Sequence, residues 1–599
     1  MKVLLGIYTT LFSAPSSLFE RTLSLVYEPL LSYLFNKPGN RVMFYQSSQM
    51  IKYMRRERGD YATLMRILSK RGDIEHLSGS WSESVLSLLP PKDRGAQIEK
   101  LTSEIRHEYG VLPHSAFFYG ELWQPHYVSL LNNAGIDNVF ISTYSEKRDV
   151  EISCEPFVMN ELGKRVNIYP VRDSVSLAVR EYADGKCDYA SLRSRILTAV
   201  HEGGEGSLIF LNIDQLVLGA VREGKGSRPG LLLCDILDRV QTLSLSSIPV
   251  KKADYLPQGW YGRDGESYSL SSINSLFVKN EGFRYLYNRF ITIAENAQTR
   301  NNRFLKKDVT TALFNTSMGN LFIYDSELAP LRYNSHRVFW RAILDAENCF
   351  WRDTEGPSMK EYDYEETGHS DYVMSNRNYL AVVSPKGASS PEFDFLPDAV
   401  NFFDTRSSFS EGDYTSTLRR SFEDRLVISG KEYGTSEMIF SSEILDRKRT
   451  EIVFTSPPDS SVPFVLTKRY KLKTNTFTLD STVFPKGGDI IDGSYSLSIY
   501  LSFEDGALQT PEQRVEMFTT GKVEAKTVKY GSKDAGSSLT ISSTEPFTLT
   551  EESGSVRMMT GLGMEEFVIW RKLTFTFPLE VPLDESVTYR LNIRDNSNK

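Results

Sequence analysis

The first 250 residues alternate short apolar runs with segments that repeat apolar residues at helical spacing. Leucines recur every three to four residues over 18–35, and helical patterns also cover 52–70 and 93–109. The apolar runs lack the period-2 alternation of half-exposed sheets, which predicts parallel strands buried on both faces. These runs are Val3–Tyr8 and residues 42–46, 74–78, 116–120, 138–143, 207–214 and 244–250. The pattern favours an α/β fold: an incomplete TIM-like (β/α)7 barrel over residues 1–258.

The remaining chain changes character twice. Residues 259–355 are mostly helical in pattern and predict a helical subdomain. Residues 356–377 are polar and rich in Gly, Ser and Tyr, which is typical of a linker or surface loop. Residues 378–599 alternate short strands with frequent turns and predict an all-β, C-terminal β-sandwich.

Composition narrows the classes of function. A net charge of −8 argues against nucleic acid or an anionic membrane as the main partner. The aromatic content of 12% slightly favours carbohydrate, because sugars stack on aromatic faces. The four cysteines and seven histidines form no metal-ligand spacing, so we expect no metal and no cofactor.

The N-terminus allows two interpretations. Residues 1–17 have the lysine, apolar run and small residues of a signal peptide, but Thr9 and Thr10 interrupt the apolar run. The alternative is that Val3–Tyr8 is the first barrel strand, and we favour it. No run approaches the roughly 20 apolar residues of a membrane span. We therefore expect a cytoplasmic protein.

Two carboxylates stand at predicted strand ends, where (β/α) barrels place their chemistry. Glu121 follows the apolar run 116–120, and Asp214 ends the run 207–214.

The stretch from 71 to 125 resembles glycoside hydrolase family 57, and within it the 4-α-glucanotransferases with a C-terminal β-sandwich. The resemblance rests on MKVLLGI at the start of the chain, Gly72-Asp-Ile-Glu75, Glu83, Val85-Leu86, Pro90, Asp93-Arg94, Gln97-Ile-Glu99, Trp123-Gln-Pro125, Ala134-Gly135-Ile136, Tyr255-Leu-Pro257 and Tyr261. Segments near 393–397, 400–405 and 419–424 resemble the start of the family's sandwich domain. The resemblance also favours the strand over the signal peptide, because cleavage would remove a barrel strand.

The resemblance implies a retaining enzyme acting on an α-1,4-glucan or maltooligosaccharide, with Glu121 as nucleophile and Asp214 as acid/base. Retention requires two carboxyl groups about 5–5.5 Å apart. Further substrate-binding candidates are Glu75, Trp81, Glu83, Trp123, Trp260, Tyr261 and Arg263. For the glutamates, hydrogen bonding at a strand end is an equally good interpretation. For the tryptophans, core packing is the more common role.

Several family segments are altered in this chain. The family has His-Asn-His-Gln-Pro after its first strand, and this chain has Tyr8-Thr-Thr-Leu-Phe12. The charged segment after the acid/base becomes the apolar run 215–219, and Arg263 stands where a glutamate is expected. Aligned from the strand, Glu121 takes the nucleophile position, but aligned from Trp123 it lies one residue late. A one-residue slip would turn its side chain to the other face.

Three functions follow from these observations. The favoured hypothesis is an α-glucan-binding family member with lost or weak catalysis. The second is an active 4-α-glucanotransferase or α-amylase that uses Glu121 and Asp214. The third is a structural or regulatory module that binds a protein partner. Homo-oligomer formation stays open.

Overall fold

In the computed structural model, the chain forms two compact units. Unit 1 comprises residues 1–276, 314–339 and 557–565, and unit 2 comprises residues 277–313, 340–556 and 566–599. The structure describes residues 2–12, 14–118, 124, 126–142, 156–171, 173–202, 206–224, 228–252, 281–316, 329–351, 356–404, 418–448, 450–458, 461–486, 490–502, 507–509, 522–532, 537–582 and 584–596. Among these residues, none of the helices combines the length and apolar character needed to cross a membrane.

Unit 1 is built on one sheet of ten strands, whose hydrogen-bonded order is β10-β6-β7-β5-β4-β3-β2-β1-β8, with β9 paired to β1. The run from β7 to β8 in this order is parallel throughout, and β6 is antiparallel to β7. The strands are β1 (Lys2–Thr9), β2 (Val42–Gln46), β3 (Ile74–Ser78), β4 (Ser115–Ala116), β5 (Asn138–Ser142), β6 (Phe157–Glu161), β7 (Lys164–Val171), β8 (Ser207–Asn212), β9 (Gln241–Thr242) and β10 (Lys251–Lys252).

Aromatic contacts show that this sheet is curled into a barrel. The rings of Phe140 on β5 and Phe210 on β8 lie 5.5 Å apart, although five steps separate the two strands in the sheet order. In a flat sheet, five steps would separate them by roughly 24 Å. Tyr8, Tyr45 and Phe117 pack into the same interior cluster. The predicted incomplete TIM-like barrel is therefore confirmed.

Two strand predictions within the barrel differ from the structure. The sixth parallel strand is β7, which is not among the predicted strands. Residues 244–250, predicted as the last strand, contain a 3-10 turn at Leu245–Ser247 instead. Short apolar runs do not distinguish a strand from a packed turn, because both bury the same side chains.

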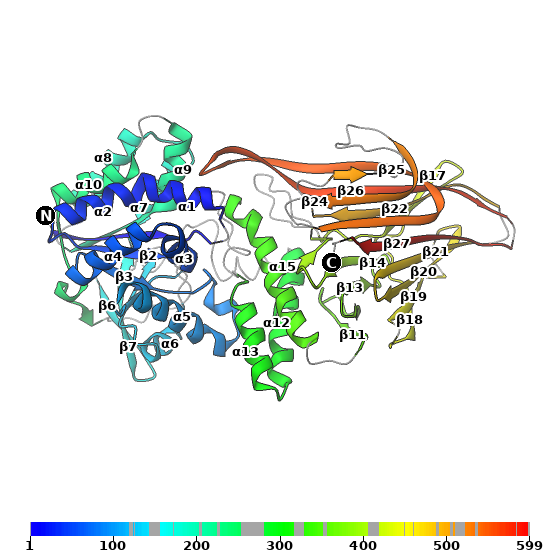
Figure 1. Ribbon diagram of the computed structural model, residues 1–599, viewed down its shortest axis with the longest axis horizontal. Coiled ribbons are helices and arrows are strands. Elements are labelled where there is room, and N and C mark those ends of the chain that lie inside the picture. Colours follow the sequence, from blue (N-terminus) through cyan, green and yellow to red (C-terminus); the bar gives the residue numbers. More distant parts are fainter. Residues whose placement is uncertain are drawn as a thin grey trace. The chain divides into compact units, whose positions relative to one another are not determined.

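Helices surround the barrel strands (Figure 1). On β2, Tyr45 points into the barrel and the next residue, Gln46, points to the helices, where its amide bonds the hydroxyls of Tyr27 and Tyr109. The helices are α1 (Ser16–Thr22), which continues through a π-turn at Leu23–Tyr27 into α2 (Glu28–Asn36), then α3 (Ser48–Glu57), α4 (Gly59–Arg71), α5 (Pro91–Tyr109), α6 (Tyr127–Asn133), α7 (Asp173–Ala183), α8 (Tyr189–Glu202), α9 (Ile213–Glu223) and α10 (Pro229–Arg239).

Unit 2 combines helices with two antiparallel sheets. The helices are α12 (Glu281–Thr299), α13 (Arg303–Leu313) and the C-terminal part of α15 (Ala329–Trp351). The five-stranded sheet contains β11 (Ser358–Tyr362), β12 (Asp371–Ser375), β13 (Tyr379–Ser384), β14 (Ser389–Phe395) and β15 (Val400–Asn401). The predicted linker at 356–377 is wrong, because β11 and β12 pair in register with this sheet.

The second sheet of unit 2 has twelve strands, and its apolar side chains form one large core with those of the first sheet. This arrangement agrees with the predicted β-rich C-terminal part. The strands are β16 (Glu423–Ile428), β17 (Lys431–Gly434), β18 (Ser441–Asp446), β19 (Glu451–Thr455), β20 (Phe464–Lys473), β21 (Thr476–Pro485), β22 (Ile491–Leu501), β23 (Ala507–Gln509), β24 (Val523–Ser532), β25 (Ser537–Thr560), β26 (Gly563–Val581) and β27 (Val587–Asp595).

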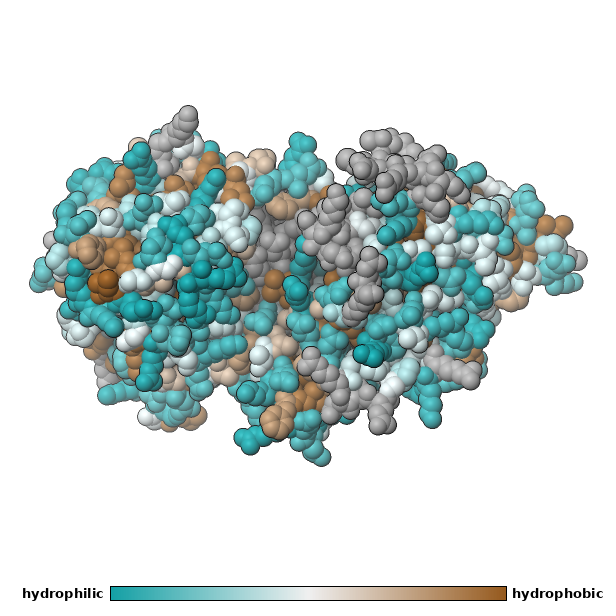
Figure 2. All heavy atoms as spheres, in the orientation of Figure 1, coloured by the Kyte–Doolittle hydropathy of each residue, from teal (hydrophilic) through white to brown (hydrophobic). Residues whose placement is uncertain are grey.

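The surface in Figure 2 is mainly hydrophilic, and apolar side chains gather there in small patches. Single exposed apolar residues are normal on a soluble domain.

Candidate functional site at the carboxyl ends of the strands

Asp214 lies at the carboxyl edge of the barrel, where the sequence predicts it. Strand β8 ends at Asn212, whose side-chain oxygen caps helix α9 by accepting hydrogen bonds from the backbone N–H of Asp214 (2.9 Å) and Gln215 (3.2 Å). Asn212 pairs in register with Tyr8 of β1. Because parallel strands end at the same edge, this register brings Asp214 beside the residues that follow Tyr8.

Two threonines hold the carboxyl group of Asp214. The Thr9 hydroxyl donates to Oδ1 at 2.6 Å, and the Thr10 backbone N–H and hydroxyl donate to Oδ2 at 2.7 and 3.1 Å. Burial raises the pKa of Asp214 to about 6, although these hydrogen bonds oppose the rise. The sequence marks Thr9 and Thr10 only as replacements for an asparagine and a histidine of the family's segment. Two hydroxyl residues directly after a strand end are the signal that could have identified them.

A second carboxyl group, that of Glu83, lies buried at the same edge. Tyr45 donates its hydroxyl hydrogen to Glu83 Oε1 at 2.8 Å, and Oε2 is buried with no hydrogen-bond partner among the described residues. Burial raises the pKa of Glu83 well above its usual range, and the charge of Asp214 raises it further. The backbone of Glu83 has a φ of 54°, which is uncommon for a residue with a side chain. Glu83 and Asp214 are therefore electrostatically coupled, and each holds its proton more tightly than an exposed carboxyl group.

Gly79 lets the loop that carries Glu83 leave β3 close to its neighbours. A Cβ atom at this position would lie 2.2 Å from the carbonyl oxygen of Phe117 and 2.7 Å from the ring of Tyr45. We expect Gly79→Ala to lower the free energy of unfolding by about 2 kcal/mol, because the carbonyl is backbone and cannot move aside. Thermal unfolding measures the change. Gly59→Ala is the control, because no atom lies within 4 Å of that Cβ position; equal stability of the two variants would contradict the prediction.

Trp81, a predicted sugar contact, is packed rather than open. Its side chain is 3% exposed, and the ammonium groups of Lys52 and Lys100 lie 4.3 and 4.5 Å from its ring centre. These cations are attracted to the electron-rich ring face. The structure assigns Trp81 to core packing, the commoner of its two predicted roles.

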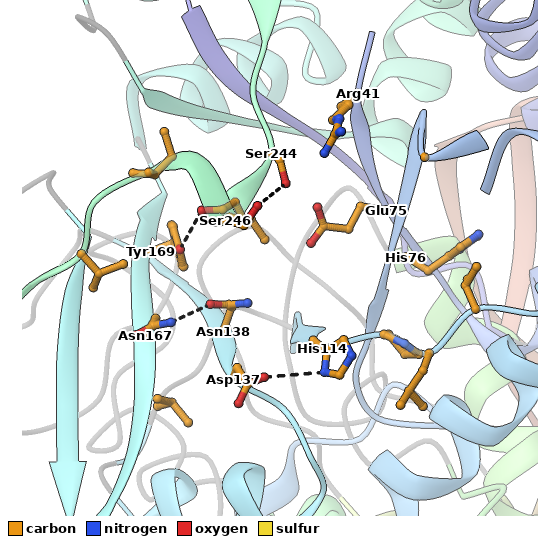
Figure 3. A pocket seen from close by; sticks show the side chains of 18 of the residues that line it. Arg41, Glu75, His76, His114, Asp137, Asn138, Asn167, Tyr169, Ser244 and Ser246 are labelled. Atoms are coloured by element: carbon orange, nitrogen blue, oxygen red, sulfur yellow. Dashed lines mark hydrogen bonds and ion pairs between the residues drawn. The ribbon is translucent and has the colours of Figure 1, made fainter. Parts of the chain in front are cut away.

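Glu75, also predicted to contact substrate, lies elsewhere. Glu75 is the second residue of β3 and pairs with Met43 of β2, which in turn pairs with Gly6 of β1. Asn212 pairs with Tyr8, two residues after Gly6, and Asp214 comes two residues after Asn212. Glu75 therefore lies about 13 Å from Asp214 along the strand direction. Glu75 instead lines a cavity at the amino ends of the strands (Figure 3). Glu75 therefore lies at the end of the barrel opposite Asp214, and its contact with substrate stays a prediction.

The other predicted site residues lie outside the described residues. They are Glu121, Trp123, Trp260, Tyr261 and Arg263.

The chain combines a parallel barrel, which has two coupled carboxyl groups at its carboxyl edge, with antiparallel sheets that follow it in sequence. These features are those of the class of barrel proteins that build their chemistry at strand ends. The model of glycosyl hydrolase family 57 matches residues 8–183. The similarity to glycosyl hydrolase family 57 lies in that part of the chain. The predicted resemblance to its 4-α-glucanotransferases is confirmed.

Relatives and a solved structure agree with this similarity. Alpha-amylase 1 of Dictyoglomus thermophilum is 27% identical over 155 residues, which cover 25% of this chain and 23% of that protein. The 4-alpha-glucanotransferase of Thermococcus kodakarensis is 28% identical over 162 residues, 26% of this chain and 24% of that protein. These matches span about a quarter of each relative. The crystal structure of the Thermococcus litoralis 4-alpha-glucanotransferase shares the fold, with a TM-score of 0.78 over 99% of both chains at 15% identity.

Proposed function

We propose that this protein binds α-1,4-glucans or maltooligosaccharides and that its catalysis is weak or lost. The observation that carries the proposal is the state of Asp214, the residue at the family's acid/base position. Both of its carboxyl oxygens accept hydrogen bonds from Thr9 and Thr10, which are themselves buried. An acid catalyst must present its carboxyl group to the glycosidic oxygen of its substrate, and both carboxyl oxygens of Asp214 are engaged by these contacts instead.

The neighbours of Asp214 support the same proposal. Tyr8 and Thr10 stand where the resemblance implies imidazoles, and Leu216 and Val217 follow where it implies charged residues. Leu216 and Val217 are buried. Preorganised polar neighbours provide much of an enzyme's rate, so their replacement by apolar side chains lowers catalysis even if both catalytic carboxylates remain.

Incubation with maltoheptaose tests this proposal. We expect the oligosaccharide to bind, as measured by calorimetry, while chromatography detects no shorter or longer products. Binding without turnover would support the proposal, and turnover at an ordinary enzymatic rate would refute it. Absence of both binding and turnover would instead favour a protein-binding role.

A second candidate function is an active retaining 4-α-glucanotransferase or α-amylase that uses Glu121 and Asp214. One observation favours it: burial raises the pKa of Asp214 to about 6, which suits a group that donates and recovers a proton near neutral pH. If maltoheptaose is converted, Asp214→Asn and Glu121→Gln should each abolish turnover while oligosaccharide binding persists. Turnover that survives both substitutions would exclude this pair.

A further inference from the structure

A cavity of about 850 Å³ opens at the amino ends of the barrel strands. Its lining comes from the starts of β3 and β5, from β6 and β7, and from the segment after β9. Barrel enzymes place their chemistry at the carboxyl ends, so this cavity is separate from the site around Asp214. Its volume lies within the range of small-molecule sites.

The floor of this cavity is a chain of hydrogen bonds that ends at Glu75. Asn167 donates to Asn138 at 2.9 Å, Asn138 donates to Ser115 at 3.2 Å, and Ser115 donates to Glu75 Oε1 at 3.3 Å. All three side-chain donors point toward the carboxyl group, which fixes the orientation of Glu75 and of the Asn138 amide. Figure 3 shows Glu75 and Asn138 directed into the cavity. Polar side chains held in fixed positions are a feature of sites that recognise the positions of a ligand's polar groups.

Arg41 faces Glu75 across the cavity (Figure 3). Among the described residues, neither a hydrogen bond nor an ion pair engages its guanidinium group. The two groups are close enough for the charge of Arg41, and that of His114, to influence Glu75, yet no ion pair joins them. His114 is itself held by Asp137, with 3.6 Å between Nδ1 and Oδ2. A space therefore separates a group that only donates hydrogen bonds from a group that accepts them.

A hydroxyl group fits this space, because it accepts from a guanidinium and donates to a carboxylate at the same time. An anionic ligand would meet the carboxyl group of Glu75, whereas a cation would meet Arg41. The walls between the polar groups are apolar and include Leu112, Val158 and Ile248. Apolar walls with a few convergent polar groups match the mixed surface of a sugar, whose hydroxyls lie at the rim and C–H groups on the faces.

We propose that the cavity between Glu75, Arg41 and Asn138 binds a neutral, hydroxyl-rich small molecule of one or two sugar rings. The site is independent of the carboxyl-edge site and of any catalysis there. Glucose and maltose are the probes, and gluconate, which carries a negative charge, is the comparison.

The test uses the full chain labelled with ¹³C-histidine, in which His114 reports on the cavity and His114→Gln assigns its resonance. Glucose or maltose should shift the His114 resonance in a saturable way. Glu75→Gln should weaken this binding on the order of tenfold, the loss expected for one hydrogen bond to a charged group. Arg41→Gln, at an exposed position, should weaken it similarly and guards against a folding defect in the first variant.

Glu99→Gln is the matched control, since Glu99 is an exposed carboxylate on α5 outside the cavity, and its affinity should equal that of the wild type. Maltoheptaose binding at the carboxyl edge should survive Glu75→Gln, so failure of this inference is distinguishable from failure of the proposed function. An unmoved His114 resonance with both sugars, or wild-type affinity in both Glu75→Gln and Arg41→Gln, would overturn the inference. Preferential binding of gluconate would also overturn it.

Discussion

The stability of unit 1 in the wild type should fall by about 2.5 kcal/mol relative to Asp214→Asn as the pH rises from 4 to 7. Burial raises the pKa of Asp214 from its ordinary value of 3.8 to about 6 in the folded protein. Between these values the folded state binds more protons than the unfolded state, so a rise in pH destabilises the fold. The difference between the two values corresponds to about 3 kcal/mol over the whole titration, and most of it falls between pH 4 and 7. Asparagine does not titrate, and its variant therefore lacks this loss.

Urea unfolding at pH 4, 5, 6 and 7 measures the effect, with hydrogen exchange in β1 and β8 reporting on unit 1 alone. Following exchange in these strands avoids treating a chain of two units as a single two-state system. Glu99→Gln is the control for general charge effects, and its stability should remain parallel to that of the wild type. If the difference in free energy of unfolding between wild type and Asp214→Asn stays constant with pH, or changes in the opposite direction, Asp214 titrates normally.

Lys468→Met should lower the free energy of unfolding of unit 2 by about 3–5 kcal/mol. Lys468 Nζ lies 2.9 Å from Asp424 Oδ2, and both side chains are fully buried in the core between the sheets. Tyr495 and Thr435 also donate hydroxyl hydrogens to Asp424, at 2.6 and 3.2 Å. These two neutral donors cannot balance the buried carboxylate once the ammonium group is removed.

Urea unfolding followed by hydrogen exchange in β16 and β20 measures this loss. Lys473→Met, at an exposed position of the same strand, is the matched control and should change stability little. The double variant Lys468→Met/Asp424→Asn should recover part of the loss, because it removes both charges together. A small effect of Lys468→Met with no recovery in the double variant would mean that the pair contributes nothing to the fold.

The barrel could be predicted from the sequence because its strands are buried on both faces. Burial on both faces requires continuous apolar runs, and helices that cover such a sheet need an apolar stripe, so both patterns are visible residue by residue. The strand β7 and the turn at 245–247 were not predicted, because a short apolar run has no periodicity that distinguishes a strand from a turn. The paired strands at 356–377 were not predicted either, because strands near the edge of a sheet can be polar.

The sequence by itself determined that Asp214 lies at the carboxyl end of a barrel strand, because a continuous apolar run precedes it. Only the tertiary structure decided what surrounds it. Thr9 and Thr10 reach Asp214 because β1 and β8 pair with Tyr8 opposite Asn212, two residues that are 204 positions apart in the chain. Register also placed Glu75 in a cavity at the opposite end of the barrel. Strand register depends on packing between distant segments, and no local pattern of residues records it.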